Sequence, residues 1–131
     1  MKNISLFLIL AFCLTVIGCG IHGPVEEVKA FITEKDDVTL QMSKKIEASP
    51  NEAGVDEARK VFEARKESLK AKKDAIYKKS EGFNADWKTM LMDSVVNDNK
   101  YFNAMRTKVV TNDAADKKFL ALEKDFQAVV R

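Results

Sequence analysis

Few residues in this chain are suited to chemistry. It has one histidine, His22, and two cysteines, Cys13 and Cys19, all near the N-terminus. A Ser-His-Asp or Cys-His arrangement needs a histidine beside its nucleophile, and no histidine follows His22. The Cys-x-x-Cys-His pattern of c-type haem and the Glu-x-x-His pattern of di-metal bundles do not occur. The sequence therefore predicts no catalytic residue, no metal site and no cofactor.

Two weaker patterns lead to the same expectation. Ser68 and Lys72 lie one helical turn apart, and a serine and a lysine at that distance can act as nucleophile and base. No loop for an oxyanion hole accompanies them, so we interpret both as surface residues. Adjacent acids such as Glu26 and Glu27 point about 100° apart on a helix, so they do not converge on one substrate. We therefore expect a protein that is not an enzyme.

Two charges stand where apolar side chains are expected. Asp98 falls on an apolar stripe that includes Phe102, and Arg65 interrupts the stripe of Phe62 and Leu69. A carboxylate on a buried face needs a partner. If the helices that carry Arg65 and Asp98 pack side by side, the two side chains face each other. We therefore predict a structural charge pair between Arg65 and Asp98. The alternative for Asp98 is a catalytic or ligand-binding role.

The N-terminal segment has the pattern of an export signal. Lys2 supplies a positive charge, and an apolar stretch from Ile4 to Ile17 follows it. The stretch is shorter than the ~20 residues that span a bilayer as a helix. It ends in Val16-Ile17-Gly18-Cys19, which resembles the lipobox of bacterial lipoproteins. An ordinary secretory signal with an incidental Cys19 is the alternative.

The resemblance implies cleavage before Cys19, transfer of diacylglycerol to its thiol, and acylation of the new amine, for example with palmitate. More than one acyl chain gives stable membrane anchoring. We thus expect a signal peptide at 1–18, a lipidated cysteine with a short tether at 19–23, and a domain at 24–131. Gly20 replaces the aspartate that favours inner-membrane retention, so in a Gram-negative cell the expected location is the outer membrane, at its periplasmic face.

The charge pattern of the domain is uneven. Residues 25–58 hold nine acids and four bases, whereas 59–79 hold nine bases and three acids. A basic helix can attract anionic lipid or another polyanion. Because the bases occur on every side of the helix, we instead expect the acidic helix before it to neutralise it. The near-neutral total charge and the export signal argue against nucleic acid as a partner.

The apolar spacing predicts helices throughout 24–131. The first begins at Pro24, capped by Gly23, and ends before Pro50. Ser49 to Glu52 match a capping box, so the second helix begins at Pro50 or, if Gly54 stays in the loop, at Val55. It carries an apolar residue every seven positions, as in a coiled-coil seam, and ends at Gly82. The heptad residues are Val55, Phe62, Leu69, Ile76 and Phe83.

The stretch after Gly82 is too long for one helix of a small bundle. Thr111-Asn112-Asp113 offers a break, and Asn97-Asp98-Asn99 competes with it. We therefore predict an all-α, up-and-down antiparallel bundle of four helices with a short last helix, in one domain, with three long helices as the alternative. Consecutive helices are expected to be neighbours. In the first pair, facing residue numbers then sum to about 100, which brings Val38 to Phe62 and Phe31 to Leu69.

Two functions fit these expectations. The first is a membrane-anchored envelope lipoprotein whose non-enzymatic bundle binds a protein or stabilises an envelope assembly. In size and anchoring it is similar to helical pilotins, which escort secretin subunits to the outer membrane. The second is a small-ligand carrier with a cavity inside the bundle. An apolar pocket of several hundred Å³ favours the carrier, and a filled core with an exposed apolar groove favours the partner binder.

Overall fold

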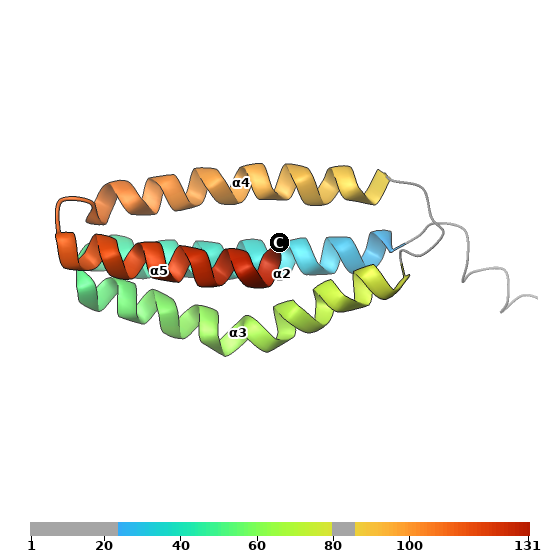
Figure 1. Ribbon diagram of the computed structural model, residues 1–131, viewed down its shortest axis with the longest axis horizontal. Coiled ribbons are helices and arrows are strands. Elements are labelled where there is room, and N and C mark those ends of the chain that lie inside the picture. Colours follow the sequence, from blue (N-terminus) through green and yellow to red (C-terminus); the bar gives the residue numbers. More distant parts are fainter. Residues whose placement is uncertain (1–23, 80–85) are drawn as a thin grey trace, which may run out of the picture.

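The computed structural model describes residues 24–79 and 86–131, which form four helices and no strand. The helices are α2 (Val25–Ala48), α3 (Glu52–Lys79), α4 (Asp86–Val109) and α5 (Asp113–Val130). They pack as a bundle in which the chain direction alternates from one helix to the next (Figure 1). The prediction of a four-helix bundle with a short last helix is confirmed.

Several expected features lie outside the described residues. They are the signal peptide, the lipidation site at Cys19, His22, the Gly23 cap, the Gly82 cap and the last heptad position, Phe83. Among the described residues, no helix is both long and apolar enough to cross a bilayer.

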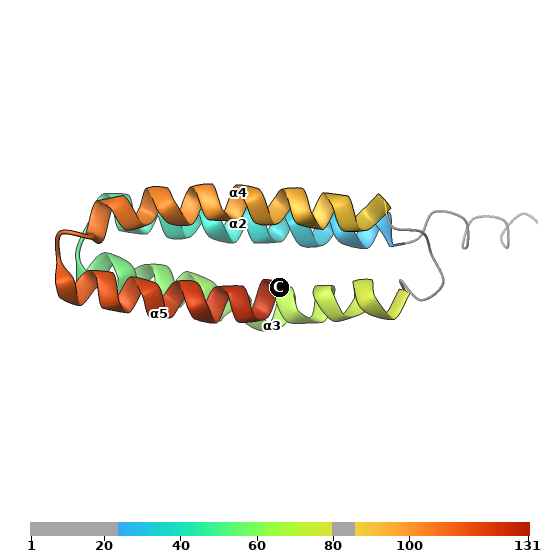
Figure 2. The same cartoon turned by 45° about the horizontal axis from the view of Figure 1, so that its top comes forward.

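The helices form two layers rather than a ring in chain order. α2 lies beside α4, and α3 lies beside α5, while the pairs α2–α3 and α4–α5 join the layers (Figure 2). α3 and α4 are therefore diagonal, and the expectation that all consecutive helices are neighbours is wrong for this pair. The six residues between Lys79 and Asp86 can extend to about 20 Å, enough to cross a diagonal between helices ~10 Å apart at each edge. Loop length alone does not decide the arrangement.

The core follows the predicted heptad of α3 closely. The first four heptad residues have no exposed surface, and they belong to one core with the buried apolar residues of α2. Four phenylalanines form a ring cluster, in which the centroid of Phe126 lies 5.5 Å from that of Phe62 and 5.1 Å from that of Phe102. Phe119 lies 5.9 Å from Phe102. This cluster joins α3, α4 and α5 around one centre.

Polar contacts confirm the register of α2 against α3. Glu34 contacts Arg65, Ser68 and Lys72, and Glu27 contacts Lys79. The residue numbers of these pairs sum to between 99 and 106, close to the value of about 100 predicted for the hairpin. Val38, Phe62, Phe31 and Leu69 are all buried in the same core.

The start of α3 differs from the predicted capping box. Asn51, not Ser49, caps the helix: its Oδ1 accepts hydrogen bonds from the backbone N–H of Ala53 at 2.9 Å and of Gly54 at 3.4 Å. Gly54 is buried, and a Cβ there would lie 1.8 Å from the carbonyl oxygen of Ser49. α3 thus includes Gly54 in its first turn. Only glycine lets this turn pack so tightly on the end of α2, because a Cβ would overlap the Ser49 carbonyl oxygen.

The break between the last two helices occurs where Asn112 caps α5. Its Oδ1 accepts a hydrogen bond from the N–H of Ala115 at 3.1 Å. The competing break at Asn97-Asp98-Asn99 is wrong, because α4 continues through it. Asn97 and Asn99 are exposed there, and Asp98 is buried with a partner from α2.

Candidate binding groove

The bundle has two halves of different composition. α5 ends near the middle, and the other three helices continue past it (Figure 1). We call one part the four-helix half, which comprises residues 38–48, 52–64, 99–109 and 113–130. The other part is the three-helix half, which comprises residues 25–37, 65–79 and 86–98.

A buried ion pair joins α2 to α4 in the three-helix half. Lys35 is 1% exposed, and its ammonium group donates hydrogen bonds to the Asp98 carboxylate and to the Ser94 carbonyl oxygen, the latter at 3.2 Å. Its Nζ also lies 3.4 Å from the Asp36 carboxylate. The charge of Lys35 is thus surrounded by oxygen atoms, as a buried ammonium group requires.

The predicted pair between Arg65 and Asp98 does not form. Asp98 pairs with Lys35, and the Arg65 guanidinium lies 3.4 Å from Glu34 with its side chain half exposed. The reason is the diagonal placement of α3 and α4, which turns Asp98 toward α2. Lys35 stands between Phe31 and Val38 on the apolar stripe of α2, so this interruption of the stripe is the sequence signal that identifies the partner.

The two buried acids of this half have opposite pKa shifts. Burial raises the pKa of Asp98 above its ordinary value, although the hydrogen bond and charge of Lys35 oppose this. Burial also acts to raise the pKa of Glu34, but hydrogen bonds from Lys72, Ser68 and Arg65 together hold it below its ordinary value. The Ser68 hydroxyl and the Lys72 ammonium group both contact the Glu34 carboxylate, at 2.9 and 2.6 Å respectively.

A groove lies between α3 and α4 beside the end of α5. It encloses about 170 Å³. Its walls are Lys73 and Tyr77 from α3, and Leu91, Met92 and Val95 from α4, and Arg131 stands at one end. The Lys35–Asp98 pair lines its interior side. Met92 is 69% exposed and Tyr77 is 50% exposed, so the groove presents apolar surface to solvent.

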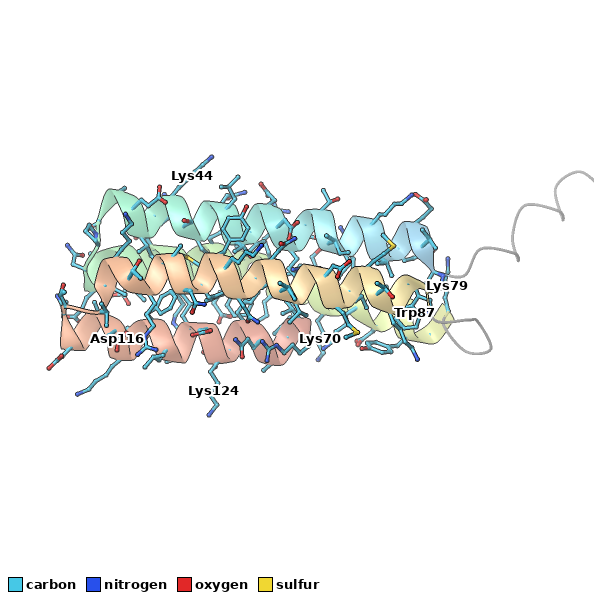
Figure 3. The ribbon with its side chains drawn as sticks, turned by 90° about the horizontal axis from the view of Figure 1, so that it is seen from above. Lys44, Lys70, Lys79, Trp87, Asp116 and Lys124 are labelled. Carbon is cyan, nitrogen blue, oxygen red and sulfur yellow. The ribbon has the colours of Figure 1, made fainter. Side chains whose placement is uncertain are left out.

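The cations of α3 are neutralised unevenly. Arg65, Lys72 and Lys79 pair with acids of α2, as expected from the charge pattern. Among the described residues, by contrast, no ion pair or hydrogen bond engages Lys70 or Lys73. Lys70 lies next to the end of α5 (Figure 3). The groove therefore has a basic edge.

Trp87 lies toward the end of the three-helix half away from α5 (Figure 3). It is buried, and its ring meets that of Tyr77 edge to face with centroids 6.2 Å apart. The Lys88 ammonium lies 5.6 Å from the centroid of the Trp87 ring. The indole Nε1 is buried, and no group of the described residues forms a hydrogen bond with it. The aromatic pair thus continues the apolar surface of the groove.

This arrangement provides recognition chemistry: exposed apolar side chains beside lysines that lack acidic partners. Among residues 24–79 and 86–131, no group of three or more His, Cys, Asp or Glu side chains is placed to hold a metal ion. No known protein family, curated protein or solved structure matches this chain. The site must therefore be interpreted from its own residues.

Proposed function

We propose that this protein is a membrane-anchored envelope lipoprotein whose non-enzymatic helical bundle binds a protein partner. The observation that carries the proposal is the groove, because it exposes Met92 and Tyr77 beside Lys73. Exposed apolar surface rimmed by polar residues is typical of interaction sites. The lipobox at Cys19 supports the anchor, and Gly20 supports an outer-membrane location in a Gram-negative cell.

The carrier function has weaker support. Pockets for small molecules usually enclose about 300 to 1,000 Å³ and bury most of their ligand. The groove encloses about 170 Å³ and opens at the side of the bundle. A charged pair lines its interior, which suits an apolar ligand poorly. The groove is better suited to side chains of a partner.

The anchor is tested by fatty-acid labelling in the native host. Cys19→Ser should abolish the label and release the protein from membranes, because Cys19 is the acceptor thiol of the lipobox. Cys13→Ser is the matched control, since it removes the other cysteine of the chain and should leave labelling unchanged. A Cys19→Ser protein that stays in the membrane fraction would contradict the lipoprotein proposal.

Partner binding is tested by chemical crosslinking in native membranes, followed by mass spectrometry. The expected result is one or a few envelope proteins recovered with the wild type and lost when Cys19→Ser releases the chain. Adducts that contain only lipid would contradict a protein-binding function. Turnover or tight retention of a small molecule by the purified protein would contradict it as well.

A further inference from the structure

We propose that the groove between α3 and α4 binds an acidic amphipathic helix of the partner protein, aligned with α5, so that the three-helix half acquires a fourth helix. This inference rests on the proposed partner-binding function and adds the surface and the chemical class of the partner segment. The first support is geometric. α5 packs on both α3 and α4, and a helix on the same line contacts the same two helices.

The apolar walls of the groove set the spacing of the guest helix. Leu91 and Val95 lie one turn apart and are only partly buried, and Met92 beside them is exposed. On the opposite wall stands Tyr77, half exposed. From Lys70 to Lys79 α3 extends ~14 Å at 1.5 Å per residue. A guest of about ten residues, with apolar side chains at helical spacing on one face, fills this length.

The charge of the groove selects an acidic guest. The lining residues include one internally paired couple, Lys35 and Asp98, whose charges offset each other. The remaining charged side chains of the lining, Lys73 and Arg131, are both positive. Lys70 adds a third cation on the same side, with no acidic partner among the described residues. Carboxylates on the flank of the guest helix supply the missing partners.

The shape of the groove favours a helix over a membrane surface. A layer of anionic lipid headgroups attracts cations that lie close to the membrane surface. Here Leu91 and Val95 are recessed between two helices, and Lys73 stands on one wall. A rod about 10 Å wide reaches these recessed side chains, whereas a planar layer contacts only the rims.

The test is site-specific photocrosslinking of the full chain in native membranes. A photoreactive amino acid at Met92 probes the groove, and the same probe at Leu40, an exposed apolar residue of α2 outside the groove, is the control. The expected result is a protein adduct at Met92 that peptide mapping assigns to an acidic amphipathic segment, at least tenfold above the adduct at Leu40.

Charge reversal provides the second arm. With the probe at Met92, Lys70→Glu/Lys73→Glu should reduce the adduct at least tenfold. Lys44→Glu/Lys124→Glu makes the same change in net charge on exposed lysines of other faces and should leave the adduct unchanged (Figure 3). Circular dichroism checks that each variant keeps its helicity. If the first variant loses helicity, the single changes Lys70→Glu and Lys44→Glu are compared instead.

Several outcomes overturn the inference. They are a lipid adduct alone at Met92, an adduct to a basic or non-helical segment, and an adduct that is indifferent to charge reversal. A protein adduct at Leu40 but not at Met92 refutes the groove while the partner-binding function stands. If neither position gives a protein adduct, both the inference and the proposed function fail.

Discussion

The two halves of the bundle bury different kinds of side chain. Among the described residues, 14 of the 19 buried hydrophobic side chains belong to the four-helix half, together with the phenylalanine cluster. The three-helix half buries five, but it also buries Glu34, Lys35, Ser94 and Asp98. The four-helix half has one buried polar residue, Thr39, whose hydroxyl donates to the Lys35 carbonyl oxygen in its own helix.

Under the proposed function, this difference assigns stability mainly to the four-helix half and partner recognition to the three-helix half. Apolar burial is the main favourable term in folding, so most of the folding free energy is expected from the four-helix half. Buried charges contribute little net stability but penalise wrong arrangements. In the three-helix half the charges organise the helices, and the apolar groove remains exposed beside them. The predictions below test this division of roles.

The largest effect is expected at the centre of the four-helix half. Phe62→Ala should lower the free energy of unfolding by about 3 to 5 kcal/mol, because the ring is fully buried against Phe126. Met92→Ala, in the groove, should change it by no more than about 0.5 kcal/mol, because its side chain is mostly exposed. Urea denaturation measures both. Equal losses for the two variants would contradict the division of roles.

The buried pair should show a large loss on single substitution. Asp98→Ala should cost about 3 kcal/mol by leaving the Lys35 charge unpaired, whereas Lys35→Met with Asp98→Leu should be close to neutral. A double-mutant cycle on Lys35 and Asp98 should therefore give a large coupling energy. The same cycle on Arg65 and Asp98 should give none, and a coupling there would contradict the diagonal placement of α3 and α4.

An intermediate effect is expected at the turn that closes the four-helix half. Gly54→Ala should destabilise the protein by about 1 to 3 kcal/mol, because the new methyl group meets the Ser49 carbonyl. Ala64→Gly, at an exposed position of the same helix, should cost about 1 kcal/mol through helix propensity alone. The usual preference for alanine is thus reversed at residue 54. A stabilised Gly54→Ala protein would contradict the tight packing of this turn.

The smallest effect is a difference in pH dependence between two acids of the three-helix half. The lowered pKa of Glu34 means that its stabilisation is present above its ordinary value of 4.5 and is lost as the pH falls through the folded-state pKa. The raised pKa of Asp98 has the opposite sign: its contribution is present below its ordinary value of 3.8 and is lost as the pH rises through the folded-state pKa.

Glu34→Gln and Asp98→Asn should therefore change the slope of stability against pH in opposite directions. Thermal unfolding from about pH 3 to pH 7, which brackets ordinary carboxyl pKa values, measures both slopes. Parallel shifts in the two variants would show that burial does not dominate at Asp98.

The sequence predicted the elements better than their arrangement. Heptad spacing located the core of α3, and Asn112 located the start of α5, because both signals are local. The neighbours of α4 depend on how all four helices pack together, which is a property of the whole bundle. The predicted pair of Arg65 and Asp98 joins helices that are not neighbours. The actual partner, Lys35, also interrupts an apolar stripe, so the sequence does contain a signal for it. The groove depends on where α5 ends in space, so no local pattern indicates it.

The Lys35–Asp98 pair also has a consequence for alignment. α2 and α4 lie side by side and run in the same direction (Figure 2), and a polar residue on the seam between two helices specifies their register. A slip of one turn moves Asp98 by about 5.4 Å along the axis, which leaves an ammonium and a carboxylate buried without each other. The pair therefore favours one axial register of α4 against α2. It thereby fixes the position along the bundle axis at which α4 presents Leu91 and Met92 to the groove.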